Sequence, residues 1–141
     1  MINKQAISGK GGMKAQGPYS IGMSYGNTLY LSAIIPINEA SEIVSEDFKK
    51  QAIQVVENIE SLLEEYDCDL SHVLRAEVSL TDMADYPGLN QVFAIYFAHP
   101  YPARSVVEVT ALPKGAKLQI QCTVAFGDVI VEEELETCET C

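Results

Sequence analysis

The length, composition and charge of this sequence exclude several classes of protein. With 141 residues, 48% of them hydrophobic and 21% charged, the chain is long enough to build one core without metal or disulfide staples. Its net charge is −11, but six of the 20 acidic residues lie in residues 128–141, which leaves −5 for the rest. A mildly acidic body without clustered Lys or Arg makes nucleic acid an unlikely partner.

The sequence predicts one domain over residues 1–127 and an acidic, disordered tail over residues 128–141, which has no hydrophobic periodicity. We expect a cytoplasmic protein with no membrane segment, because no stretch approaches the ~18 apolar residues of a transmembrane helix and no secretory leader is visible. In that compartment the four cysteines are expected to be thiols, namely Cys68, Cys122, Cys138 and Cys141.

The first half of the chain is predicted to hold a strand hairpin followed by a helix. Residues 27–37 are densely apolar, follow Gly26-Asn27 and contain Pro36, a pattern typical of a buried strand. Residues 19–24 are its expected hairpin partner. Residues 46–66 repeat apolar side chains at helical spacing, with acidic residues in the first turn.

The second half alternates strands and a helix. Residues 73–80 alternate as a strand with one wet face does. A second helix is expected with Pro87 in its first turn, ending before His99. Two further strands are predicted at residues 104–109 and 117–126.

The predicted order β-β-β-α-β-α-β-β indicates an α+β fold, in which one mixed sheet carries two helices on one face. Strands with apolar residues on both faces, such as residues 27–37, indicate that another subunit covers the second face.

One charged residue stands out as a candidate for chemistry. Arg104 enters an otherwise apolar strand just after a turn bounded by Pro102. Arginine is rarely fully buried without a partner. The partner is either Glu108 or another acid of the chain, or the guanidinium faces a pocket and holds a carboxylate through two hydrogen bonds. Spacing alone does not choose between these alternatives.

The remaining candidates are weaker. His72 and His99 stand alone and are expected to be structural or exposed, and Cys68 and Cys122 are expected to be small core residues. The Cys138-to-Cys141 pair lacks a second pair of ligands, so we predict no metal site and no cofactor. Residues 9–12 have the wrong spacing for a phosphate-binding loop and are expected to form a flexible turn.

Three stretches resemble landmarks of the RidA family, also called YjgF or L-PSP. They are PARSVVEVTALPKGA at residues 102–116, GPYS at 17–20 and LSAIIP at 31–36, in the family's order and at similar separations. The resemblance covers about residues 4–127 and leaves the tail outside.

This resemblance implies a chorismate-mutase-like fold and a homotrimer with a barrel-like core, whose ligand lies in each cleft between neighbouring subunits. It places a carboxylate-binding arginine at Arg104 and ligand-contacting residues at Tyr19, Ser32 and Asn90. A backbone carbonyl that orients water falls at Val106, where family members often have cysteine.

Departures from the family pattern concern the same expected site. Gln119 stands where active members have a glutamate that relays a proton, and an amide cannot exchange a proton in this way. Ala33 stands where glycine is usual, and Ile34 where glutamine is common. We therefore expect a site that keeps its ligand-binding residues but has weakened catalysis. Its expected catalytic positions are Arg104, Val106 and Gln119.

Three functions follow as hypotheses. The first is an enamine/imine deaminase that hydrolyses reactive 2-imino acids, such as 2-iminopropionate, to 2-keto acids and ammonia. The second is a protein that binds or senses small carboxylates or keto acids without catalysis, which Gln119 favours. The third is the endoribonuclease activity attached to the L-PSP name, which the acidic body favours least.

Overall fold

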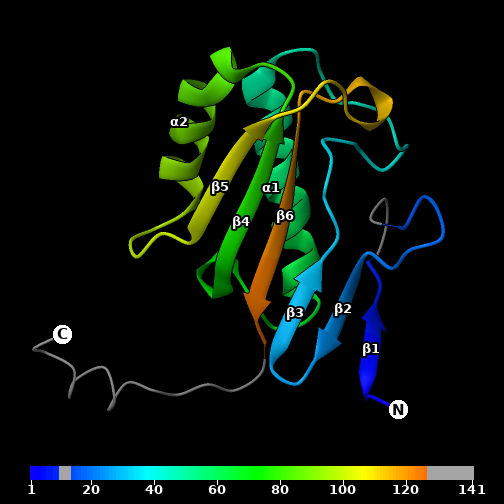
Figure 1. The fold of residues 1–141 in the computed structure, drawn as a ribbon. Helices are drawn as coiled ribbons and strands as arrows, with labels where there is room; N and C mark the ends of the chain where they lie inside the picture. Colours follow the sequence, from blue (N-terminus) through cyan, green and yellow to red (C-terminus); the bar gives the residue numbers. More distant parts are fainter. Residues whose placement is uncertain (10–13, 127–141) are drawn as a thin grey trace, which may run out of the picture.

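The structure is a computed structural model that describes residues 1–9 and 14–126. It contains one six-stranded sheet with strand order β1-β2-β3-β6-β4-β5 and two α-helices (Figure 1). The predicted order β-β-β-α-β-α-β-β is confirmed. The strands are β1 (Lys4–Ile7), β2 (Gly22–Tyr25), β3 (Thr28–Leu31), β4 (Val73–Leu80), β5 (Ala103–Glu108) and β6 (Leu118–Ala125), and the helices are α1 (Phe48–Glu64) and α2 (Tyr86–Tyr96).

The N-terminal strands form an antiparallel meander. The turn between β2 and β3 contains Gly26 with a φ of 61°, a conformation that costs glycine little. At Gly22 a Cβ atom would lie 2.6 Å from Cδ1 of Ile7, so any other residue would force the Ile7 side chain to move. The meander thus depends on two glycines that occupy different structural roles.

The long strand predicted over residues 27–37 is shorter in the structure. Pairing with β2 ends at Leu31, after which Ser32 donates its N–H to the Ile21 carbonyl. The segment stays beside β6, with which β3 already pairs at residues 28–30, and Ile34 and Ile120 exchange two backbone hydrogen bonds of 2.8 and 3.1 Å. The regular strand therefore ends where pairing with β2 stops, and the run is buried only in part, since Tyr30 is 51% exposed.

The C-terminal half of the sheet is mixed. β6 pairs antiparallel with both β3 and β4, whereas β4 and β5 are parallel and are joined through α2. A parallel pair needs such a crossover connection. β5 therefore forms one edge of the sheet, and β1 forms the other.

Both helices begin at features visible in the sequence. The side chain of Asp47 accepts the N–H of Lys50 at 3.0 Å and caps α1, so the acidic residues expected in the first turn lie at and before the cap. Pro87 lies in the first turn of α2, as predicted. Neither helix in the described part of the chain is long and apolar enough to cross a membrane.

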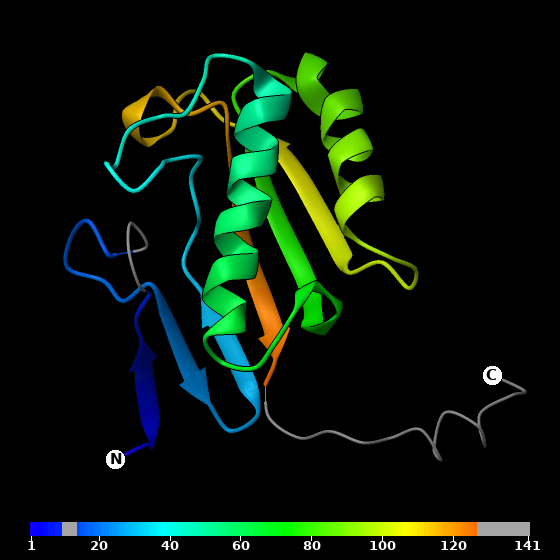
Figure 2. The same cartoon turned by 180° about the vertical axis from the view of Figure 1, so that it is seen from behind.

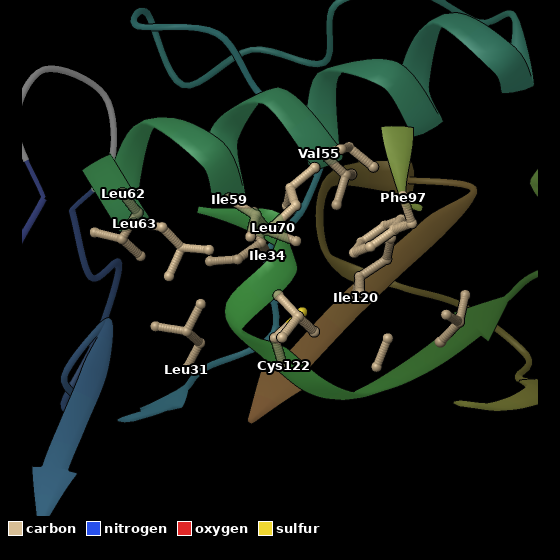
Figure 3. Packing of buried hydrophobic residues seen from close by; sticks show 14 of the residues in the cluster. Leu31, Ile34, Val55, Ile59, Leu62, Leu63, Leu70, Phe97, Ile120 and Cys122 are labelled. Carbon is tan, nitrogen blue, oxygen red and sulfur yellow. The ribbon is translucent and has the colours of Figure 1, made fainter. Parts of the chain in front are cut away.

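The helices cover one face of the sheet (Figure 2). Apolar side chains of α1 meet those of β3, β4 and β6 in a single cluster, part of which Figure 3 shows. Its fully buried members include Leu29, Val55, Val56, Ile59, Leu62, Leu63, Leu80, Leu89 and Leu118. This core fixes which face of each strand is available for a site.

The opposite face of the sheet is open in the single chain. Tyr25 and Tyr30 are about half exposed there, at 52% and 51%, and so is Val107 at 52%. The subunit expected to cover this face is a prediction that a single chain does not test. The predicted acidic tail at residues 128–141 lies outside the described residues, as do Cys138, Cys141 and most of the expected turn at residues 9–12.

Candidate functional site

Arg104 lies on β5, at the edge of the helix-covered face. Its register partner on β4 is Ala76, which is fully buried, so the Arg104 side chain projects toward α2. Nη2 donates to Oδ1 of Asn90 at 2.7 Å and to the hydroxyl of Tyr86 at 3.2 Å. The guanidinium carbon also lies 4.9 Å from the centre of the Phe93 ring. Neutral groups and aromatic rings therefore hold this cation.

Glu108 is not the partner of Arg104. Its Oε1 accepts the backbone N–H of Met83 at 2.7 Å and so fixes the turn that precedes α2. Within residues 1–9 and 14–126 the one acid–base pair at ion-pair distance is Asp69 with His72, whose Oδ1 and Nδ1 atoms lie 3.0 Å apart. Arg104 is thus half-buried, and no described acid forms an ion pair with it.

A cavity of about 300 Å³ opens beside the guanidinium. It is lined by Asn90, Phe93, Ala94, Tyr101, Pro102 and Arg104. Of the lining residues, Phe93 makes a cation–π contact with the guanidinium, and Tyr86, outside the lining, makes a second one with its ring centre 5.5 Å from the guanidinium carbon. We call this space the arginine cavity. It offers one fixed cation to a small anion.

The backbone at Val106 faces the open edge of the sheet. Val109 donates its N–H to the Leu80 carbonyl on β4, and backbone groups in a strand alternate in direction. The amide and carbonyl of Val106 therefore point away from β4. Because β5 is an edge strand, that carbonyl has no strand partner within the described chain and can accept a hydrogen bond from water.

Tyr19, Ser32 and Gln119 line a second cavity, of about 410 Å³, which we call the glutamine cavity. The Ser32 hydroxyl donates to the Ser20 carbonyl at 2.6 Å, and the Tyr19 hydroxyl accepts the N–H of Gln16 at 3.1 Å. The side-chain amide of Gln119 has no hydrogen-bond partner among the described residues. It is therefore available to a ligand.

The structure divides the predicted site residues into two sets. Arg104, Asn90 and Val106 lie on β5 and α2, whereas Tyr19, Ser32 and Gln119 surround the glutamine cavity. On β6, Gln119 alternates with the buried Leu118 and Ile120, so it faces the open side of the sheet. Arg104 faces the covered side, and the two residues cannot meet within one chain.

Sequence reasoning did not assign Tyr86 or Phe93 to the site. Tyr86, Asn90 and Phe93 follow one another at spacings of four and three residues, which places them on one face of α2. That pattern is readable in the sequence, but it predicts a shared face without saying that Arg104 lies beneath it. The pairing of β4 with β5 supplies that information.

The weaker candidates have structural roles. His72 closes a capping box with Asp69 around the short helix at residues 70–72. Cys68 and Cys122 are buried free thiols, as expected, and burial raises the pKa of the Cys122 thiol to about 12. No group of three or more potential metal ligands occurs in the described part of the chain.

Comparison with known proteins agrees with this fold. The family model described as endoribonuclease L-PSP matches residues 10–126. Reactive Intermediate Deaminase A, chloroplastic, from Arabidopsis thaliana is 36% identical over 86% of this chain, which spans 65% of that relative. A RutC family protein from Sulfurisphaera tokodaii is 44% identical, and the match covers 81% of this chain and 92% of that protein.

A solved structure extends the agreement to three dimensions. RidA from an Antarctic Psychrobacter has a TM-score of 0.82 and 39% identity to this chain, and the match covers 86% of this chain and 99% of that one. The mixed sheet with two helices on one face was predicted from the sequence, and the RidA structure has the same fold. Sequence, family model and fold agree that this chain belongs to the RidA/YjgF/L-PSP family.

Proposed function

We propose that this chain is an enamine/imine deaminase, which hydrolyses 2-imino acids to 2-keto acids and ammonia. The observation that carries the proposal is the half-buried Arg104, which neutral groups hold and no described acid neutralises. A planar guanidinium can bind a carboxylate through two hydrogen bonds. Similarity to a protein named Reactive Intermediate Deaminase A supports the reaction class.

The proposed ligand needs groups from two chains. Because Arg104 and Gln119 face opposite sides of one sheet, one chain cannot present both to a small molecule. We propose a homotrimer in which the arginine cavity of one subunit meets the glutamine cavity of its neighbour. The half-exposed Tyr25 and Tyr30 on the open face support burial of that face by another copy.

In this cleft the carboxylate of the imino acid binds Arg104, with Asn90 fixing the guanidinium, while Tyr19 and Ser32 contact the rest of the ligand. A water molecule held by the Val106 carbonyl attacks the imine carbon. The carbon–nitrogen bond breaks as the new carbonyl forms, and the nitrogen leaves as ammonia with protons from water. Such imines are intrinsically reactive, so orientation alone supplies part of the acceleration.

Gln119 limits this chemistry. A glutamate at this position can pass a proton from the attacking water to the departing nitrogen, whereas an amide cannot. We therefore propose weakened catalysis. The same residue favours the second candidate function, a protein that binds keto acids or related carboxylates without turning them over.

Endoribonuclease activity, which the family description names, is supported least. Fourteen acidic residues against nine basic ones in residues 1–127 repel a phosphate backbone.

The test is the turnover of 2-iminopropionate, generated in situ from L-alanine by an amino acid oxidase. We expect the protein to accelerate imine loss, measured as reduced trapping by semicarbazide, and Arg104→Ala to remove the acceleration. Binding of pyruvate without any acceleration would instead establish the binding function.

A further inference from the structure

The glutamine cavity is larger and more apolar than a three-carbon imino acid requires. Its volume of about 410 Å³ lies in the range of cavities that bind ligands of drug-like size. Away from Tyr19, Ser32 and Gln119 the lining is mainly aliphatic, and its apolar members are Ile21, Ala33, Ile34, Ile35, Ile37 and Pro113. A small polar ligand would leave most of this surface uncovered.

Ile35 is the residue best placed to contact a ligand side chain. Ile34 is 2% exposed and packs in the core beside Ile120, so its side chain mainly serves the fold (Figure 3). Neighbouring side chains of an extended segment point to opposite sides, which turns Ile35 toward the cavity that it lines. The Ile35 carbonyl accepts a hydrogen bond from Nδ2 of Asn58 on α1 at 3.3 Å, and this contact holds the backbone at Ile35 in place.

The cavity also includes two cations, and they lie at its rim. Lys14 and Lys114 are both exposed, and no acidic residue joins them in the lining. Nζ of Lys114 already donates to the Ser41 carbonyl at 2.9 Å. The interior available to a ligand is thus aliphatic, with the positive charge at the entrance.

We infer that the cavity receives a branched aliphatic side chain, so that the preferred substrates are 2-imino acids derived from amino acids such as leucine. Ile35 is the specificity-determining residue. This inference rests on the proposed function, because it takes Tyr19, Ser32 and Gln119 to lie beside the reacting imine. In an apolar pocket, one methylene group changes kcat/KM by about 10–200-fold.

The first experiment compares imines generated in situ from L-leucine, L-alanine and L-glutamate. We expect kcat/KM for the leucine-derived imine to exceed that for the alanine-derived imine by at least about tenfold. Equal values, or a preference for the alanine-derived imine, would overturn the inference. A preference for the glutamate-derived imine would overturn it as well, and would assign the distal carboxylate to Lys14 and Lys114.

A matched pair of variants tests the role of Ile35. Ile35→Gln places an amide in the aliphatic lining, and we expect the leucine-to-alanine ratio to fall toward one. Ile95→Gln makes the same change on α2, where the side chain is 76% exposed, and should leave the ratio unchanged. An unchanged ratio in a folded Ile35→Gln protein would contradict the assignment, and if that variant does not fold, the wild-type ratio decides.

Binding measurements separate this inference from the proposed function. If wild-type protein turns over neither imine, the hydrolase proposal fails, and calorimetry with 4-methyl-2-oxopentanoate and pyruvate then decides the cavity's preference. Tighter binding of the branched keto acid would support the inference alone. Equal affinities, or tighter binding of pyruvate, would reject it.

Discussion

The two faces of the sheet differ in how their side chains are packed, and strand β6 has side chains on both faces. Leu118, Ile120 and Cys122 point under the helices and are at most 2% exposed, whereas Gln119 and Gln121 alternate with them on the open side. Packing against α1 explains the covered residues completely. No element of the described chain packs on the open ones, which face away from both helices.

The proposed site crosses this division. Arg104 is a charge on the covered face, tolerated because β5 lies at the sheet edge where Asn90 and Tyr86 can solvate it. Gln119 is a neutral amide on the open face. The covered face therefore supplies a rigid cation, and the open face supplies a group that a partner or ligand must complete.

The largest expected difference between the faces is in stability. Ile120→Ala removes a side chain that is 1% exposed and leaves a cavity under α1, so the free energy of unfolding should fall by about 2–5 kcal/mol. Gln121→Ala, one residue along on the open face, should change it by no more than about 0.5 kcal/mol. Urea denaturation of both variants measures the contrast, and similar losses would mean that Gln121 contributes as much packing as the core residue Ile120.

Ligand affinity should depend most strongly on the arginine cavity. Arg104→Ala removes the guanidinium, and we expect the affinity for pyruvate to fall about 100-fold, since hydrogen bonds between charged groups are the strong ones. Lys50→Ala, which removes one positive charge from an exposed position on α1, is the control and should leave affinity unchanged. Retained affinity in Arg104→Ala, measured by calorimetry, would show that the arginine is structural.

The open face should respond to a change of one side-chain group. Gln119→Glu introduces a carboxylate that can relay a proton, and we expect imine hydrolysis to rise at least about tenfold. The gain should vanish as pH falls below the usual glutamate pKa of about 4.3, because the protonated acid cannot accept a proton. Gln121→Glu adds the same charge outside the glutamine cavity and should give no gain. Equal gains would indicate a general charge effect.

The fold was readable from the sequence because its signals are local. Period-two alternation at residues 75–80 and the helical apolar spacing after Phe48 each report which side of an element is buried. The alternation fails at Val73 and Leu74, where a register shift buries the valine and leaves the leucine 54% exposed. The run at residues 27–37 misled only in length, since an apolar pattern does not reveal that pairing with β2 stops after Leu31 and that only the bridge from Ile34 to β6 follows.

The site was less readable because it depends on strand order. The sequence indicated Arg104 and Gln119 individually, but their placement on opposite faces follows from the pairing register, in which Arg104 lies beside Ala76 and Gln119 beside Ser79 of β4. The contact of Arg104 with Tyr86 likewise requires the parallel crossover through α2. Asn90 and Tyr86 lie 14 and 18 residues before Arg104, and contacts at such separations leave no periodic signal in a single sequence.

The smallest expected effect concerns a titratable group on the covered face. Burial raises the pKa of the Cys122 thiol from 9.0 to about 12, so the folded protein keeps this proton between pH 9 and pH 12 while the unfolded chain loses it. The unfolded state is therefore favoured as pH rises through that window, and the stability that the buried thiol contributes is present below pH 9 and lost above it. Between pH 8 and pH 10 the loss from this one group should be about 1.4 kcal/mol. The Cys122→Ala variant lacks this thiol. Its free energy of unfolding should therefore fall less than that of the wild type between pH 8 and pH 10, and the difference should equal the loss from this one group. Parallel slopes for the two proteins in chemical denaturation would mean that the thiol reaches solvent and that the covered face is less tightly closed than its packing indicates.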